Sequence, residues 1–182
     1  MSRLRVRHLG LDLLDRQLVD ADGVLCGKVD DVELERAADG RLRVAALLVG
    51  PGAWPERLPA PLRGVARRLF GDRAARVLWP EVREANSAVK LNRKAGDLRP
   101  ERLGDRLRLS WLLGRRLSQQ HGGRPARIRD VEVAPRGADL EVVAVLTGGR
   151  GLLARLGLPI GRRAEERLAW EGLADEAAVR MS

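Results

Sequence analysis

The 182-residue sequence contains very few aromatic residues: no tyrosine, one phenylalanine and four tryptophans. Its hydrophobic core must therefore be built mainly from Leu, Val and Ala around the tryptophans. Cys26 is the only cysteine, which excludes an intramolecular disulfide and a cysteine-rich zinc site. We interpret Cys26 as a small core residue, and one lone thiol fits the reducing cytoplasm.

Motifs for catalysis and for cofactor binding are also lacking. His8 and His121 have no serine, cysteine or carboxylate at a spacing typical of a catalytic or metal-binding set, so we interpret both as surface residues. The glycines of residues 148–151 are not part of a complete phosphate-binding motif, which favours a plain turn. We therefore expect no enzyme, no cofactor, no catalytic residue and no metal site.

No apolar run approaches the roughly 20 residues that a membrane-spanning helix needs. Arg3, Arg5 and Arg7 precede an apolar stretch, as in a signal peptide, but Asp12 and Asp15 interrupt that stretch. The sequence therefore predicts a cytoplasmic protein. A peripheral position on the inner face of the membrane is left open.

Positive charge is abundant, with 34 Lys and Arg residues against 25 Asp and Glu residues, a net charge of +9. Apolar residues make up 45% of the chain and charged residues 32%, which is typical of a soluble globular protein. The excess charge predicts attraction to RNA, to acidic lipid surfaces or to acidic proteins, without choosing among them.

The sequence contains an internal repeat. Residues 13–18 recur as residues 112–117, residues 31–33 recur as residues 130–132, and further on Trp79 matches Trp170. Self-similarity of this kind indicates duplication of one structural unit. We expect a first module at residues 1–92, a basic linker at residues 93–105 and a second module at residues 106–182.

Turn residues divide each copy into short segments. Residues 20–23 and 39–40 supply turns, and residues 41–49 are apolar on both faces, as expected for a strand buried in the middle of a module. Residues 11–19 and 24–35 are predicted to form a hairpin. About five or six short strands in each copy suit a small barrel, which has no exposed sheet edges. The predicted fold is mainly β: two tandem small antiparallel β-barrels with short helical insertions.

These motifs resemble the PRC-barrel family. The resemblance rests on a D-x-D-G turn at residues 20–23, a G-x-V-x-D-V strand at residues 27–32, the strand at residues 39–44 and a tryptophan strand at residues 77–82. It covers nearly all of residues 11–91 and, more weakly, residues 110–181. Members of this family occur in the photosynthetic reaction-centre H subunit, in a ribosome-maturation factor and beside metal-transporter domains. The resemblance implies docking on a larger assembly and no shared catalytic residues.

The predicted partner-binding residues lie between the third and fourth strands of the first copy. Trp54 is on a loop with no matching tryptophan in the second copy, and loop tryptophans often anchor interfaces; burial against its own barrel is the alternative. Apolar residues between positions 62 and 70 follow a helical period, beside the cations Arg63, Arg67, Arg68 and Arg73. This helix can face a partner, or its apolar side can cover an open barrel end.

We therefore predict a non-enzymatic adaptor or scaffold that docks on a larger, perhaps membrane-associated, protein complex. The alternative is an RNA- or ribosome-associated protein that binds through arginine-rich surfaces at residues 63–76 and 93–108. The scarcity of aromatics argues against base stacking, so such binding would use phosphates or ribosomal protein. The sequence does not determine the oligomeric state.

Four acidic residues, Asp30, Asp31, Glu33 and Glu35, could be interpreted as a site for a hard cation. The last three alternate along one strand, so their side chains should share one side of the sheet. We expect that side to face solvent and the acids to have no ligand.

Overall fold

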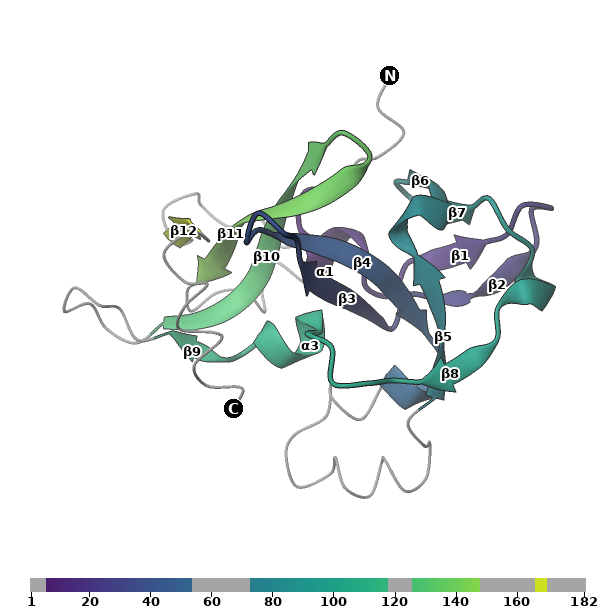
Figure 1. Cartoon of the computed structure of the whole chain (residues 1–182), viewed down its shortest axis with the longest axis horizontal. Helices are drawn as coiled ribbons and strands as arrows, with labels where there is room; N and C mark the ends of the chain where they lie inside the picture. The colour runs from purple at the N-terminus through teal and green to yellow at the C-terminus, as the bar shows by residue number, and fades with distance from the viewer. Residues whose placement is uncertain (1–5, 54–72, 118–125, 148–165, 170–182) are drawn as a thin grey trace.

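The computed structural model describes residues 6–53, 73–117, 126–147 and 166–169 (Figure 1). Over these ranges the fold is mainly β, which confirms the predicted class. Up to residue 102 the elements are α1 (Leu9–Asp12), β1 (Gln17–Val19), β2 (Leu25–Lys28), β3 (Asp31–Arg36), β4 (Leu42–Val49), η1 (Pro51–Ala53), β5 (Arg73–Leu78), η3 (Trp79–Glu81), β6 (Val82–Ala85), β7 (Val89–Leu91), η4 (Ala95–Asp97) and β8 (Pro100–Arg102). The later elements are α3 (Leu109–Leu112), β9 (Arg116–Leu117), β10 (Ala126–Arg136), β11 (Asp139–Thr147) and β12 (Glu166–Ala169).

The smaller sheet has the strand order β2-β1-β7-β6. β1 and β2 form an antiparallel hairpin, as do β6 and β7, while β1 and β7 run parallel. Asp20 closes the first hairpin, because its Oδ1 accepts hydrogen bonds from the amides of Asp22 at 2.9 Å and Val24 at 2.8 Å. Gly23 takes the left-handed conformation that this turn needs, with φ 84°. The predicted turn at residues 20–23 is therefore confirmed.

The two long strands predicted around this turn are both divided. Residues 11–19 begin in the short helix α1, and only the end of that range forms β1. Residues 24–35 form β2 and β3 in two different sheets: the Val29 amide donates to Arg16 O, whereas the Asp30 amide donates to Leu48 O. The chain changes sheet between these two residues. A single continuous strand was therefore the wrong prediction.

The larger sheet is organised around β4, whose residues 44–49 are all buried, as predicted for a central strand. One edge of β4 pairs with β3. Its other edge pairs with β5 over Ala46–Val49 and with β11 at Arg43, so strands of both modules extend one sheet of eight strands. In the described residues both sheets are open, and closed barrels are not observed. β4 and β11 pair at Arg43 and Glu141, so the larger sheet continues from one module into the other.

The strand β11 repeats the pairings of β4. β4 pairs with β3 and β5, and β11 pairs in the same way with β10 and β12. Ala46 lies opposite Leu78, and Ala144 lies opposite Ala169. Each of these partners immediately precedes one of the two tryptophans that the sequence matches. The two copies therefore share one strand arrangement around β4 and β11.

Residues 93–105, predicted as a linker, belong in part to the first module's sheets. The strand β8 pairs with β5, with Pro100 opposite Ala75. The Ala95 amide donates to Asp20 Oδ2 at 3.0 Å, and this bond is the main cause that lowers the pKa of the Asp20 carboxyl. The connection is thus fixed to the first module as far as residue 102.

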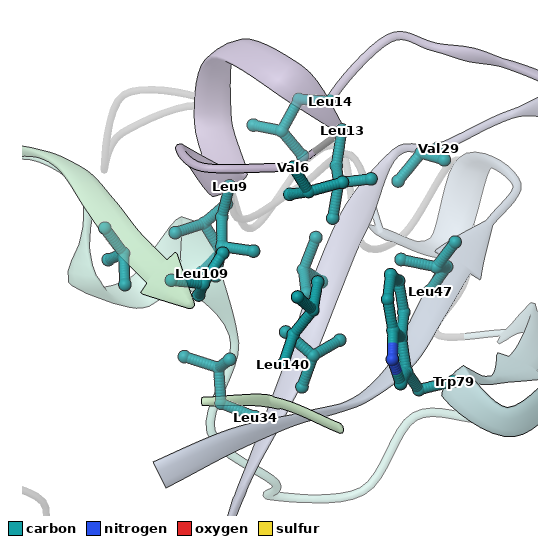
Figure 2. Close-up of a cluster of buried hydrophobic side chains, with 14 of the residues drawn as sticks. Val6, Leu9, Leu13, Leu14, Val29, Leu34, Leu47, Trp79, Leu109 and Leu140 are labelled. Carbon is teal, nitrogen blue, oxygen red and sulfur yellow. The ribbon is translucent and has the colours of Figure 1, made fainter. Parts of the chain in front are cut away.

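The hydrophobic core is shared by the two modules. Figure 2 shows Leu34, Leu47 and Trp79 of the first module in the same cluster as Leu109 and Leu140 of the second. Trp79 is 2% exposed, which confirms its predicted packing role. Its indole Nε1 donates to the carbonyl oxygen of Ala138, a residue of the second module, at 3.2 Å.

Candidate functional site

The contact surface between the two modules, which we call the seam, holds the buried charged residues Asp31, Glu33, Arg108 and Glu132. It is built on one tripeptide that occurs in both copies, Asp-Val-Glu at residues 31–33 and 130–132. We predicted that Asp31 and Glu33 face solvent, which is wrong: Asp31 is 0% exposed and Glu33 is 4% exposed. Of the three alternating acids of β3, only Glu35 is exposed.

The acids are buried because each module covers the other module's tripeptide with its own N-terminal segment. The Leu34 amide of β3 donates to Leu107 O at 2.8 Å, and Glu33 forms a β-bridge with Arg108. In the opposite direction, the Val133 amide of β10 donates to Arg7 O at 2.8 Å, and Glu132 forms a β-bridge with His8. The two halves are therefore interlocked reciprocally.

The aspartate of each tripeptide caps a helix of the other module. Asp31 accepts hydrogen bonds from the Ser110 amide at 3.1 Å and from Ser110 Oγ at 2.5 Å. Asp130 accepts from the amides of Gly10 at 2.7 Å and Leu11 at 3.0 Å. The first amides of a helix have no partner within it, and carboxylates satisfy them well. Neither α1 nor α3 has a side-chain cap from its own N-cap residue.

Both capping carboxyls titrate above their usual range. Burial raises the pKa of Asp31, against hydrogen bonds from Ser110 and Val32. Burial likewise raises the pKa of Asp130, against hydrogen bonds led by the Gly10 amide. Each of these aspartates therefore contributes fully to the stability of the fold when the pH is below the ordinary aspartate pKa of 3.8. This contribution is lost as the pH rises through the raised pKa of the folded chain.

Gly10 permits the close approach of α1 to Asp130. A Cβ at this position would lie 2.9 Å from both carboxylate oxygens, which real Cβ atoms do not tolerate. We expect Gly10→Ala to lower the free energy of unfolding by about 1 to 2 kcal/mol, because the carboxylate must retreat from the amides that it caps. Urea denaturation measures the change. Gly96→Ala is the matched control, since its Cβ would meet no atom within 4 Å; equal losses for the two variants would contradict this interpretation.

The glutamate of each tripeptide binds an arginine of the other module. Glu33 Oε1 lies 3.1 Å from Nη1 of Arg106, and Glu132 Oε1 lies 3.2 Å from Nε of Arg7. Glu33 also binds Arg76 of β5 through both carboxylate oxygens, at 2.7 to 3.2 Å. These hydrogen bonds are the main cause that raises the pKa of Arg76. The first module's glutamate therefore joins β3, β5 and the segment before α3.

Arg108 completes the seam beside Asp31. It is 6% exposed and stacks on Trp111, with its guanidinium carbon 5.0 Å from the ring centroid. Its Nη2 donates to Gly104 O at 2.7 Å. A guanidinium that is both stacked and hydrogen-bonded is held firmly, so Arg108 fixes the start of α3 to the segment before it.

The seam shows no arrangement for metal binding or for nucleophilic catalysis. Within the described ranges, no group of three or more His, Cys, Asp or Glu side chains could hold a metal ion. Ser110 is hydrogen-bonded to Asp31, whereas His8 interacts electrostatically with the other aspartate, Asp130. The serine and the histidine are therefore paired with different carboxylates. The described contacts of the seam join the first module to the second.

The remaining sequence candidates have varied surroundings. His8, predicted at the surface, is half-buried because its backbone lies in the seam. Cys26 is also half-buried and packs against the core, and burial raises the pKa of its thiol. His121, Trp170 and the glycines of residues 148–151 lie outside the described residues. Where the chain is described, none of its helices has the length and apolarity to cross a bilayer.

Among the predicted partner-binding residues, Arg73 is the one within the described ranges. Trp54, Arg63, Arg67 and Arg68, together with the predicted helix, lie outside them. In the sequence, the segment that carries these residues lies between η1 and β5. Both ends are therefore attached to neighbouring strands of the larger sheet.

Arg73 lies on β5, next to the edge strand β8 of the larger sheet. It is the first residue of β5, and the pairing of β5 with β8 places it directly opposite Arg102. Both arginines are exposed, and Arg73 Nη2 donates to Pro100 O at 3.2 Å. Like charges at opposed positions of a sheet repel each other. This pair, which we call the β5–β8 edge, therefore places two cations side by side at the surface.

A scan against models of protein families finds no match to this chain, and a search of curated proteins finds no significant relative.

Proposed function

We propose that this protein is a non-enzymatic adaptor, related to tandem PRC-barrel proteins, that docks on a larger protein complex. The open sheets leave each module incomplete as a barrel over the described residues, and the seam joins the two into one body. Such a body suits a rigid docking platform. Its expected location is the cytoplasm, with the inner membrane face as a second possible place of assembly.

The observation that carries this proposal is the β5–β8 edge. Arg73 and Arg102 are opposed and exposed, and Arg73 directly follows in sequence the segment that contains Trp54, Arg63, Arg67 and Arg68. Arginine and tryptophan are the residue types that most often dominate the binding energy of protein interfaces. The excess of positive charge makes an acidic protein surface the complementary partner.

A pull-down with the tagged full-length chain tests the proposal, using nuclease-treated cytoplasmic and membrane fractions of the native cell at moderate salt. We expect one stoichiometric protein complex, with recovery reduced about tenfold by Arg73→Glu because the charge complementarity is reversed. Trp54→Ala should also release the partner. Arg83→Glu is the matched control, because Arg83 is exposed on β6 in the smaller sheet.

Two outcomes of the pull-down would contradict the proposal. If the Arg73→Glu and Trp54→Ala variants recover the same complex as well as the unmodified chain does, the β5–β8 edge and Trp54 are not the binding surface. Recovery of ribosomal material alone from parallel untreated fractions, with no partner recovered after nuclease treatment, would reject the adaptor function.

A further inference from the structure

A second arginine cluster lies on the hairpin of β9 and β10, on strands other than those of the β5–β8 edge. Arg116 of β9 lies opposite Arg127 of β10 in the strand register. Arg115 and Arg129 adjoin them in sequence, and Arg115, Arg127 and Arg129 are exposed. Arg127 Nη1 donates to Gly114 O at 3.0 Å. Because Gly114 directly precedes Arg115, the guanidinium of Arg127 lies close to the backbone next to Arg115. We call the three exposed arginines, Arg115, Arg127 and Arg129, the arginine hairpin.

The backbone of this hairpin does not require the arginines. In the second module, Gly114 N donates to Ile128 O and Ile128 N donates to Arg115 O, at 2.8 and 2.9 Å. The first module forms the same pair of bonds among Asp15, Val29 and Arg16, at the same two distances. The two modules therefore share one local backbone with different side chains.

The charge at these matched positions differs sharply. Residues 15–18 and 27–30 of the first module contain two cations and two acids: Arg16, Lys28, Asp15 and Asp30. Residues 114–117 and 126–129 of the second module contain four arginines and no acid.

One matched position shows that the change removes a structural bond. Asp30 Oδ2 accepts a hydrogen bond from the Gly50 amide at 2.6 Å. Arg129 replaces it in the second module, and a guanidinium can only donate. The second copy has thus exchanged an acceptor that supports the fold for a cation at the surface.

We propose that the arginine hairpin binds the phosphate backbone of a nucleic-acid strand. Guanidinium groups bind phosphates through paired hydrogen bonds, and a two-stranded ribbon presents them in a row. Neither β9 nor β10 contains an aromatic residue on which bases could stack, so binding is independent of base sequence.

A membrane surface fits this cluster less well. Peripheral binding to lipid usually combines cations with exposed apolar side chains that enter the bilayer. The large apolar side chains that are exposed in the described part of the chain are Leu11, Val24, Leu25 and Leu78, and none of these is on β10. The pure cationic character of the hairpin favours a polyphosphate backbone.

Fluorescence anisotropy of a labelled single-stranded RNA of roughly 20 nucleotides, titrated with the full-length chain over a range of salt concentrations, tests this proposal. The combined variant Arg115→Gln, Arg127→Gln and Arg129→Gln should weaken binding at least about tenfold at low salt. It should also reduce the slope of log affinity against log salt by about 2, because fewer counterions are released. Replacement of the same three residues by lysine should retain most of the slope.

The matched control is the double variant Arg16→Gln and Lys28→Gln, which removes the cations from the same positions of the first module and should leave binding unchanged. Equal affinity of the unmodified chain and the triple glutamine variant would overturn the proposal. Binding to phosphatidylserine vesicles that is tighter than binding to RNA, and is lost in the same variant, would overturn it in favour of a lipid surface.

Discussion

Replacement of Asp31 by alanine is expected to lower the free energy of unfolding by about 2 to 3 kcal/mol. The side chain is 0% exposed and accepts hydrogen bonds from the amide and hydroxyl groups of Ser110 in the other module. Without the Asp31 carboxylate, the amide and hydroxyl groups of Ser110 at the start of α3 lose this hydrogen-bond acceptor. Urea denaturation followed by circular dichroism measures the loss.

The pH dependence of this loss has a defined sign. Because burial raises the pKa of Asp31, its contribution to stability declines as the pH rises through the raised value. The loss caused by Asp31→Ala should therefore be largest below the ordinary pKa of 3.8 and should become smaller as the pH rises above it. Asp105→Ala is the control, since Asp105 is exposed on the connection before α3. A loss of stability as large in this control would contradict the capping role.

Replacement of Glu33 by alanine should be at least as damaging, with an expected loss of about 2 to 4 kcal/mol. Its side chain is 5% exposed and binds Arg76, whose own side chain is only 20% exposed. Removal of the carboxylate leaves this guanidinium largely buried without its main partner. It also releases Arg106, and with it one contact between the modules.

Glu101→Ala is the matched control for Glu33→Ala. Glu101 lies 4.0 Å from the same Arg76, but its side chain is 56% exposed, and exposed ion pairs contribute little to stability. Thermal unfolding of the two variants should separate them clearly. Similar melting temperatures would show that the buried position of Glu33 has no special importance.

Local signals in the sequence predicted the local parts of the fold. The D-x-D-G turn follows from Asp20, whose side chain binds amides within the turn itself. The central position of β4 follows from apolar residues on both faces of one segment. The packing role of Trp79 follows from its match with Trp170. Each of these inferences needed residues close in sequence, or the repeat alone.

The seam could not be predicted in the same way, because its contacts join residues far apart in the chain. Alternating acids on β3 normally indicate a solvated face, and Asp31 and Glu33 would be solvated if the first module stood alone. The segment around Ser110 covers them. One signal was available: Asp-Val-Glu is the only acidic pattern that both copies keep, whereas Asp30 and Glu35 are replaced by Arg129 and Ala134.

Closed barrels were predicted for a related reason. The strand pattern of one copy does not show whether the sheet closes on itself or joins the other copy. The pairing of Arg43 with Glu141 at the centre of the larger sheet determines this outcome. Arg41 binds Glu141 and Arg43 binds Asp139, both at 3.1 Å, so charge complementarity between the two central strands accompanies the pairing.

The central claim is that each module binds the N-terminal segment of the other, and a double-mutant cycle between Asp31 and Ser110 tests it most directly. Free energies of unfolding are measured for Asp31→Ala, Ser110→Ala and the combined variant, with Asp105→Ala and Ser110→Ala as a parallel control cycle. We expect a coupling free energy of about 1 to 2 kcal/mol between Asp31 and Ser110, and additive effects in the control. Additive effects of Asp31 and Ser110 would contradict the interlocked arrangement.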